Sequence, residues 1–391
     1  MLSRLAVPWL AVLTLQATTM QIAALHIAET LAVALGSLWL GGMVDRRGKR
    51  AVMLACDGLR AVVFGLLVLA AVRGAVTMTL LVAAAAAAAL ATVAFEMARS
   101  AWIAQRIEAG DLPHRNAQLS MVGSVSETAA FALGGWVYQG LGAVVALVVD
   151  ALSYGLSAVC LRGVPEVPGA ARAAASSIHP LRALLDEAAD GLRAVWGRLV
   201  LRSLSAIQAL LAFSMGLTGT SVMIYTARDV ALPPGVLGMV FALGALGSIA
   251  GAWLAPRLGR ALGPGRAITL GLVAFTLGAA CVPMATGPGL AAVLLLAAHQ
   301  IVGDGGHTLH DVHDRTLRQT AVPPELLARA DAGIRTVGAW ASLAGTLAGG
   351  LLGEAFDART VLWGAVVAGG AAALLAALTL GRSVSRAGHS L

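Results

Sequence analysis

Two long apolar stretches near the start of the chain are separated by the sequence Gly41-Gly42-Met43-Val44-Asp45-Arg46-Arg47-Gly48-Lys49-Arg50. A helix needs roughly 20 apolar residues to cross a bilayer, and the stretches on either side, about 20–44 and 51–72, are that long. The basic residues that follow the first of these stretches, Asp45–Arg50, are therefore predicted to form a tight loop between two membrane-spanning helices. Gly41 would allow close helix approach, and Gly48 would allow the turn.

The composition of the whole chain agrees with a membrane protein. Of its 391 residues, 58% are hydrophobic and only 12% are charged, whereas soluble domains carry about a quarter charged residues. The mean hydropathy is +0.83. These values exclude a soluble enzyme, a disordered protein and a nucleic-acid binder, because one core cannot hide so much apolar surface. Cys56, Cys160 and Cys281 lie far apart, so a disulfide framework is not expected.

Apolar runs predict twelve membrane spans joined mostly by very short loops, which makes the protein an all-α integral membrane protein. The predicted spans cover about 4–18, 20–44, 51–72, 76–98, 118–140, 142–162, 201–225, 233–255, 267–286, 288–310, 331–353 and 359–381. We therefore expect a six-helix bundle at 1–162, a linker at 163–200, a second bundle at 201–381 and a tail at 382–391. Within the linker, the pattern of apolar and charged residues from Leu181 to Trp196 predicts an amphipathic helix at the membrane surface.

The distribution of the basic residues predicts the orientation. The loops after the even-numbered spans, the linker and the tail hold 21 Lys and Arg residues, whereas the opposite side holds only Arg73, Arg228 and Arg359. Because basic loops stay in the cytoplasm, the linker and the C-terminus are predicted to be cytoplasmic.

Weak internal similarity suggests that the two bundles are repeats. At an offset of 211, Arg46 matches Arg257, Gly48 matches Gly259 and Lys49 matches Arg260, which places Pro256 opposite Asp45. Further along, the offset becomes 215, and Gly134-Gly135 matches Gly349-Gly350. Six-span repeats of this kind are typical of secondary transporters.

The loop sequence matches the pattern G-x-x-x-D-R-x-G-[RK]-[RK] at Gly41, Asp45, Arg46, Gly48, Lys49 and Arg50. In this respect the chain resembles the major facilitator superfamily. Three further segments resemble a bacterial branch that contains macrolide-efflux-like and enterobactin-exporter-like proteins: Asp57–Arg60, Asp150–Tyr154 and Arg318–Arg329. The resemblance implies a twelve-helix fold in the bacterial inner membrane, a central cavity between the halves and export driven by proton exchange.

The first span departs from the family pattern, in which about 35 or more residues precede the second span. Here the loop pattern already begins at Gly41, and the roughly 16 residues available for the first span reach only about 24 Å. We therefore expect span 1 to lack its first part, and a start codon assigned too far downstream is the simplest cause.

The loop pattern also implies a conformational latch. In the family, the acid equivalent to Asp45 reaches the N-terminal end of span 11 in one conformation, where the helix dipole favours a carboxylate. Arg46 and Arg50 would pair with acids or phosphate groups. The plainer alternative is that these residues only anchor the loop on the cytoplasmic side.

Charged residues inside spans are expensive and are therefore candidates for function. Asp57 and Arg60 share a helical face, as do Glu96 and Arg99, so each pair can neutralise itself. Arg335 in span 11 needs an acidic partner. Glu29, Glu127 and Asp150 are candidates for carrying the coupled proton, with Ser153 and Tyr154 near enough to hydrogen-bond to Asp150.

Four of the eight histidines lie between His299 and His313. His307, His310 and Asp314 fall on one helical face, with His313 and Asp311 nearby, so metal binding and proton relay are both chemically reasonable. The plainer interpretation is a polar cytoplasmic end of span 10, and we expect no metal site.

No P-loop or nucleophile motif is present in the sequence, so we expect a transporter that uses the proton gradient and no cofactor, and not an enzyme. The predicted function is proton-coupled efflux of small amphipathic or lipophilic compounds by a monomer. Candidate polar anchors in the cavity are Gln21, Trp136, Tyr138, Gln208 and Tyr225. The alternatives are a transport-incompetent or sensor-like protein that keeps the fold, and a lipid or lysolipid translocator.

Overall fold

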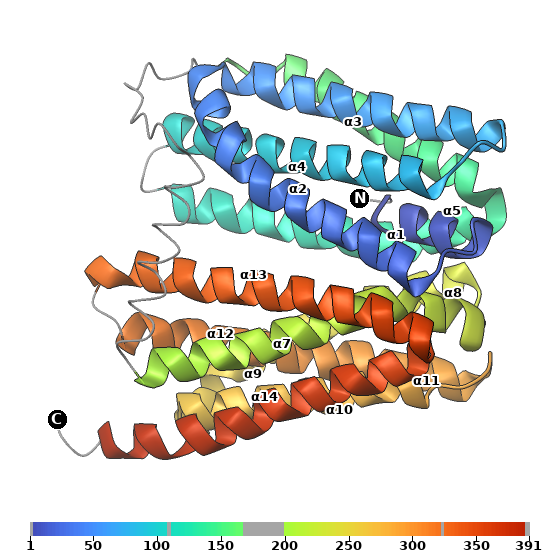
Figure 1. Ribbon diagram of the computed structural model, residues 1–391. Coiled ribbons are helices and arrows are strands. Elements are labelled where there is room, and N and C mark those ends of the chain that lie inside the picture. The colour runs from blue at the N-terminus through green and yellow to red at the C-terminus, as the bar shows by residue number, and fades with distance from the viewer. Residues whose placement is uncertain (1–2, 108–110, 167–198, 322–323, 388–391) are drawn as a thin grey trace. The chain divides into compact units, whose positions relative to one another are not determined.

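The computed structural model describes residues 3–107, 111–166, 199–321 and 324–387, and these residues contain no β-strand (Figure 1). The predicted linker helix Leu181–Trp196 lies outside the described residues. Contacts divide the chain into two compact units. The N-terminal unit is Met1–Ala17 with Ala24–Ala183, and the C-terminal unit is Thr18–Ala23 with Leu184–Leu391.

The first six predicted spans fall on the helices of the N-terminal half. A π-helical segment, η1, continues the first helix, and one long helix, α5, covers spans 5 and 6. This helix is broken at Gly142, whose φ of 82° no helix adopts, as expected for the short turn predicted there. The elements are α1 Ser3–Trp9, η1 Leu10–Thr14, α2 Thr19–Arg46, α3 Lys49–Val72, α4 Met78–Arg106 and α5 Leu112–Arg162.

The other six predicted spans fall on the C-terminal helices, where two spans are divided into shorter pieces. Span 8 lies on α8 and α9. Span 10 lies on α11, η3 and the first part of α12, and α12 continues beyond the predicted span end at about residue 310. The elements are α7 Leu199–Ile224, η2 Tyr225–Asp229, α8 Pro234–Ala242, α9 Gly244–Leu262, α10 Pro264–Met284, α11 Leu290–Ala298, η3 His299–Gly303, α12 Asp304–Ala321, α13 Pro324–Ala355 and α14 Ala358–Ala387.

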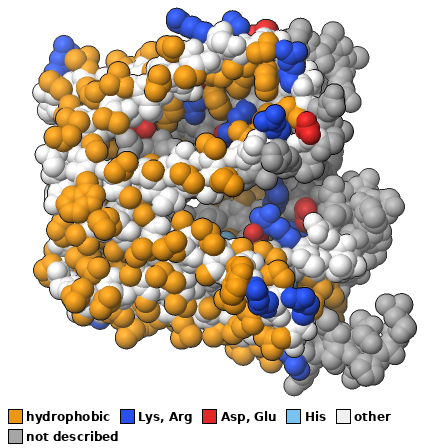
Figure 2. Space-filling model, turned by 180° about the vertical axis from the view of Figure 1, so that it is seen from behind, with side chains coloured by type: hydrophobic (Ala, Val, Ile, Leu, Met, Phe, Trp, Pro, Cys, Tyr) orange, Lys and Arg blue, Asp and Glu red, His pale blue; other side chains and the backbone are white. Residues whose placement is uncertain are grey.

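The surface of the helices suits a lipid environment. Seven helical segments of the described chain are long and apolar enough to cross a membrane, and the segment Met121–Arg162 among them contains two predicted spans. Hydrophobic side chains cover much of the face shown in Figure 2. Large apolar side chains such as Val62, Leu133 and Val367 are exposed, and in a membrane they face lipid instead of water.

The two halves repeat each other at one constant offset. The π-helical segments η1 and η2 begin at Leu10 and Tyr225, whose numbers differ by 215. The only non-glycine residues with positive φ in the described chain, Gln16 at 53° and Ala231 at 55°, are separated by the same interval. Because π-helical turns and left-handed residues are rare, this coincidence establishes the register of the repeat.

This register corrects the offset of 211 predicted around the basic loop. Gly48 is the N-cap of α3, and Gly263 is the N-cap of α10, again 215 residues later. The structural equivalent of Gly48 is therefore Gly263 and not Gly259, and Arg260, not Pro256, is equivalent to Asp45. Matching the letters Arg and Gly gave the wrong register because both residues recur every few positions in basic loops.

Glycines bring α9, α10 and α12 into backbone contact in the C-terminal unit. A Cβ atom added at Gly251 of α9 would collide with the carbonyl oxygen of Gly305 in α12. A Cβ added at Gly271 of α10 would lie 2.7 Å from the carbonyl oxygen of Gly306. Small residues at helix contacts are the usual means of close packing in membranes, and here they fix α12 between its two neighbours.

We expect Gly271→Leu to lower the melting temperature of the detergent-purified protein, because overpacking of this kind costs about 1–3 kcal/mol. Gly65→Leu in α3 is the matched control, since nothing lies within 4 Å of a Cβ at that position. Leucine favours helix over glycine by about 1 kcal/mol, so the control should melt no lower than wild type. Equal effects of the two substitutions would contradict close packing at Gly271.

Candidate functional site

The basic loop is held by hydrogen bonds from both of its sides. Lys49 is only 1% exposed, and its Nζ donates a 2.6 Å hydrogen bond to the carbonyl of Val44 in the last turn of α2. A cation at the C-terminus of a helix complements the helix dipole and satisfies a carbonyl that has no partner in the helix. The side chain of Asp45 is not among those the structure describes, so the latch role of Asp45 stays a prediction.

Glu166, which follows the end of α5, caps the N-terminus of α3. Its carboxylate accepts hydrogen bonds from the backbone N–H groups of Arg50, at 2.9 Å, and Ala51, at 3.2 Å. A Cβ at Gly48 would lie 2.8 Å from the carboxyl carbon of Glu166. A larger residue at position 48 would push this carboxylate aside, so a glycine favours its close approach to the start of α3.

The segment around Glu166 joins three helices at the basic end of the N-terminal unit. Arg50 Nη1 donates to the carbonyl of Val164 at 3.1 Å, and Trp102 Nε1 of α4 donates to the carbonyl of Pro165 at 2.9 Å. Residues Val164–Glu166 thus connect the start of α3 with the end of α4. Sequence reasoning missed Glu166, although an acid beside Pro165, directly after the last predicted span of the bundle, was a usable signal.

We expect Glu166→Ala to lower the melting temperature by the equivalent of about 1–2 kcal/mol, because two helix N–H groups lose a charged acceptor. Glu166→Gln should have a smaller effect, since its amide oxygen still accepts. Asp111→Ala is the control, because Asp111 precedes α5 without forming a side-chain cap. If Glu166→Ala melts like this control, the cap does not stabilise the loop.

The predicted pair Asp57–Arg60 forms and is buried. The two side chains are 2.5 Å apart, and Ser157 Oγ of α5 donates a 2.6 Å hydrogen bond to the second oxygen of Asp57. Breaking a buried ion pair by removing one partner typically costs about 3–5 kcal/mol, because the remaining charge is stranded. The pair Glu96–Arg99 also forms, on an exposed part of α4.

Aromatic rings complete the surroundings of Arg60. Its guanidinium carbon lies 4.8 Å from the ring centroid of Phe95 and 4.6 Å from that of Tyr154. Tyr154 is itself stacked on Phe64, with 5.7 Å between the centroids. Cation–π contacts of this kind stabilise a desolvated cation, so α3, α4 and α5 each contribute to a single neutralised cluster.

The three predicted proton carriers lie in different surroundings. Glu29 is partly exposed, and one of its carboxylate oxygens is 3.6 Å from Nδ1 of His26 on the same helix. Asp150 is 1% exposed, and the hydroxyl of Ser153 donates to its backbone carbonyl at 2.7 Å. Glu127 is half-buried. Sequence reasoning named Glu29 but missed its titratable neighbour, His26.

Most of the predicted cavity anchors have local structural contacts. Gln21 and Thr18 form a capping box at the start of α2, in which each side chain accepts the other's backbone N–H. Tyr225 is buried, and its hydroxyl donates to the carbonyl of Ala285 at 2.8 Å. The ring of Tyr138 lies 5.2 Å from that of Trp9.

The other predicted site residues, Trp136, Arg335 and Gln208, form fewer of the contacts that the structure describes. Trp136 is 49% exposed, and Arg335 is exposed and forms no ion pair with a carboxylate of the described residues. Gln208 is half-buried and packs within the C-terminal unit, where a Cβ at Gly338 would lie 3.4 Å from its side chain.

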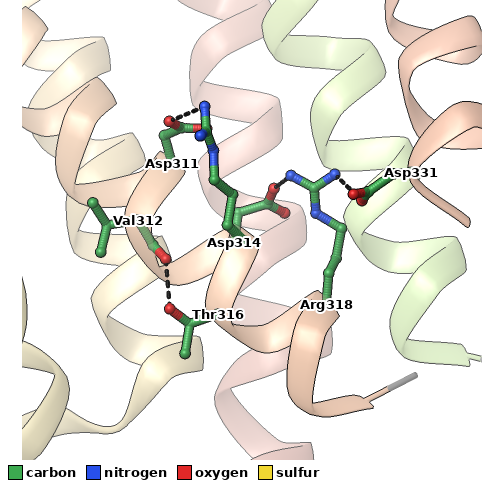
Figure 3. Close-up of polar contacts among 7 residues, drawn as sticks. Asp311, Val312, Asp314, Thr316, Arg318 and Asp331 are labelled. Carbon is green, nitrogen blue, oxygen red and sulfur yellow. Dashed lines mark hydrogen bonds and ion pairs between the residues drawn. The ribbon is translucent and has the colours of Figure 1, made fainter. Parts of the chain in front are cut away.

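Two separate groups of ion pairs lie on α12, and one of them reaches α13 (Figure 3). Asp311 pairs with Arg315 at 2.9 Å, one turn apart on an exposed surface. Asp314 pairs with Arg318, which also contacts Asp331 of α13 at 2.9 Å. Arg318 therefore contacts one carboxylate on each helix and joins α12 to α13 through Asp331. At 11% side-chain exposure it is largely screened from solvent.

The histidines of α12 are packed against neighbouring helices. His313 is buried, and its Nε2 lies 3.0 Å from the carbonyl oxygen of Ala255 in α9. His310 is 2% exposed, and the ring of His307 is 6.0 Å from that of Phe275 in α10. Within the part of the chain that the structure describes, no three His, Cys, Asp or Glu side chains come together as metal ligands.

Burial raises the pKa of Asp314 to about 6, even though the neighbouring Arg318 favours its charged form. Because the pKa in the folded state lies above the unfolded value of about 3.9, the folded state binds more protons between these values. This carboxyl group therefore destabilises the fold above about pH 6 and gradually ceases to do so as the pH falls towards 4.

The melting temperature of wild type relative to Asp314→Asn should accordingly rise as the pH falls from 7 to 5. Differential scanning fluorimetry of both proteins at several pH values measures this difference. A difference that is constant over the range, or that changes in favour of the variant at low pH, would contradict the raised pKa.

Known proteins that resemble this chain have the same all-helical membrane fold. The family model described as Major Facilitator Superfamily matches residues 1–309. The chain belongs to the major facilitator superfamily. It is therefore a multi-pass membrane protein with the fold of secondary transporters and not an enzyme. No curated protein sequence matches it.

Solved structures of transporters share the fold along nearly the whole chain. The nucleoside transporter NupG aligns with a TM-score of 0.75 at 15% identity, covering 97% of this chain and 93% of that one. A bacterial homologue of the iron transporter ferroportin in an inward-facing state gives 0.73 at 17% identity, with 97% and 94% covered. A bacterial homologue of the human lysosomal transporter Spinster gives 0.70 at 15%, with 98% and 94% covered. At these identities the similarity shows the fold alone.

Proposed function

We propose that this protein is a proton-coupled exporter of small amphipathic or lipophilic compounds in the bacterial inner membrane, with its C-terminus in the cytoplasm. Family membership supports alternating access, and the positions of the basic residues support the orientation. The observation that carries proton coupling is the Glu29–His26 pair within an otherwise apolar part of α2.

The chemistry of this pair suits the reversible binding of a proton. Imidazole and carboxylate groups can each bind and release a proton, and the two side chains lie 3.6 Å apart, three residues apart on the same helix. Neither side chain is buried by the protein, with exposures of 35% for His26 and 40% for Glu29. In contrast, Asp57 is 1% exposed and is neutralised by Arg60 and Ser157. Asp57 is therefore a poor carrier, and Glu29 is our first choice over Glu127 and Asp150.

The apolar composition of α2 also supports a lipophilic substrate. Before the basic loop, which begins at Asp45, the only acid in α2 is Glu29, and most of the other residues are apolar. Small-molecule sites are typically lined by apolar side chains with few polar groups, and this composition supports a lipophilic substrate. The nucleoside and metal transporters found by structural comparison share only the fold, so their substrates are not transferred to this chain.

The experiment is an accumulation assay in an efflux-deficient bacterial host that expresses the protein. A panel of lipophilic dyes and antibiotics is tested with and without a protonophore. We expect lower accumulation of at least one compound, and we expect the protonophore to abolish this difference. Unchanged accumulation of every compound, at verified membrane expression, counts against export.

Glu29→Gln should abolish the protonophore-sensitive part of export, because the amide cannot bind the coupled proton. His26→Gln should shift the pH dependence of export and leave some activity, since Glu29 remains. Asp111→Asn, an exposed acid outside the predicted spans, is the control and should behave as wild type. Export by Glu29→Gln at the wild-type rate and with wild-type protonophore sensitivity would exclude Glu29 as the carrier.

A further inference from the structure

A groove with a volume of about 440 Å³ lies within the N-terminal unit, between α3, α4 and the two ends of α5. Its walls are mainly apolar and include Met53, Phe95, Leu119 and Leu161. This volume lies within the range of about 300–1,000 Å³ that is usual for small-ligand sites. The groove is open on one side, so an elongated ligand can enter it.

Two arginines, Arg99 and Arg115, line the same groove. Arg99 is paired with Glu96, which leaves little net charge at that point. Arg115 donates a 3.2 Å hydrogen bond to Gln118, and no carboxylate of the described residues forms an ion pair with it. The groove therefore combines apolar walls with one cation whose charge is not balanced by a described acid.

The start of α5 adds to this positive potential. Arg115 lies in the first turn of α5, which begins at Leu112. Helix N-termini carry a partial positive charge and present N–H groups that have no acceptor in the helix. An anionic group beside Arg115 would thus interact favourably with both the guanidinium and the end of the helix.

The location of the groove points to the membrane surface. It adjoins Trp102, whose indole N–H donates to the carbonyl of Pro165 at 2.9 Å next to the basic loop. Tryptophan is enriched at the level of the lipid headgroups. The arginine count predicts this end of the bundle to be cytoplasmic, and the cytoplasmic leaflet is the one that attracts basic residues through anionic lipids.

We propose that this groove binds one anionic phospholipid of the cytoplasmic leaflet, with the phosphate beside Arg115 and part of an acyl chain between Phe95, Leu119 and Leu161. Charge complementarity selects the headgroup, and the apolar walls require the chain. The lipid is a bound ligand and not a transported substrate. The proposal depends on membrane insertion and not on export, so it can fail or succeed separately from the proposed function.

The test is native mass spectrometry of the full chain purified in detergent, with phosphatidylglycerol or phosphatidylcholine added in equal amounts. The quantity measured is the fraction of protein that retains one lipid. We expect phosphatidylglycerol to be retained in preference to phosphatidylcholine. Arg115→Gln should reduce that preference about fivefold, as expected for the loss of one arginine near an anionic surface.

Two further variants distinguish lipid binding in the groove from nonspecific attraction of anionic lipids to basic residues. Leu119→Trp fills the groove and should reduce retention of both lipids, while Arg115→Gln should affect only the anionic one. Arg73→Gln, at the opposite end of α3, is the control and should retain phosphatidylglycerol as wild type does. Equal retention of the two lipids by wild type, equal losses in Arg115→Gln and Arg73→Gln, or wild-type retention by both groove variants would each overturn the proposal.

Discussion

Each ionised side chain that lies deep in the bundles must have a partner, because lipid and the protein interior cannot solvate a charge. In the N-terminal unit, Asp57 and Arg60 neutralise each other, and Ser157 and two aromatic rings complete their contacts. In the C-terminal unit, Arg318 serves two carboxylates from different helices. The ion pairs lie within one helix or between consecutive helices, whereas Ser157 and Tyr154 reach the first pair from α5. Satisfying the charges therefore also links α3 to α5 and α12 to α13.

The two repeats share backbone features more closely than they share side chains. The π-helical segments, the left-handed residues and the N-caps recur at an interval of 215. At the same interval, Arg60 and Thr92, which are hydrogen-bonded at 3.4 Å, correspond to Phe275 and His307, whose rings are in contact. One position in the repeat thus holds a charged cluster in the first half and an aromatic–imidazole contact in the second, so the halves have diverged chemically on a common backbone.

Sequence reasoning succeeded where the physical signal was local. Apolar runs located the spans, and the spacing of Asp57 and Arg60 indicated their pairing because neighbours at i and i+3 share a helical face. It missed the contacts of Glu166, Ser157 and Tyr154, because they join residues about 100 positions apart and no local pattern records them. The cavity roles of Gln21 and Tyr225 stay predictions; the structure adds that Gln21 Oε1 and the Tyr225 hydroxyl bond to backbone groups. Sequence reasoning also predicted an offset of 211 between the repeats at the basic loop. The offset of 215 is visible only in backbone features, such as N-caps and left-handed residues, which the letters of the sequence do not show.

The most direct test of the central claim is proton movement by the purified protein in proteoliposomes. A pH-sensitive dye is enclosed in the vesicles, and a compound identified by the accumulation assay is added on one side without an imposed gradient. Secondary active export predicts that the compound drives a proton flux that requires the protein, stops in Glu29→Gln and stays normal in Asp111→Asn. Movement of the compound with no accompanying change in internal pH, at equal protein content, would contradict proton coupling.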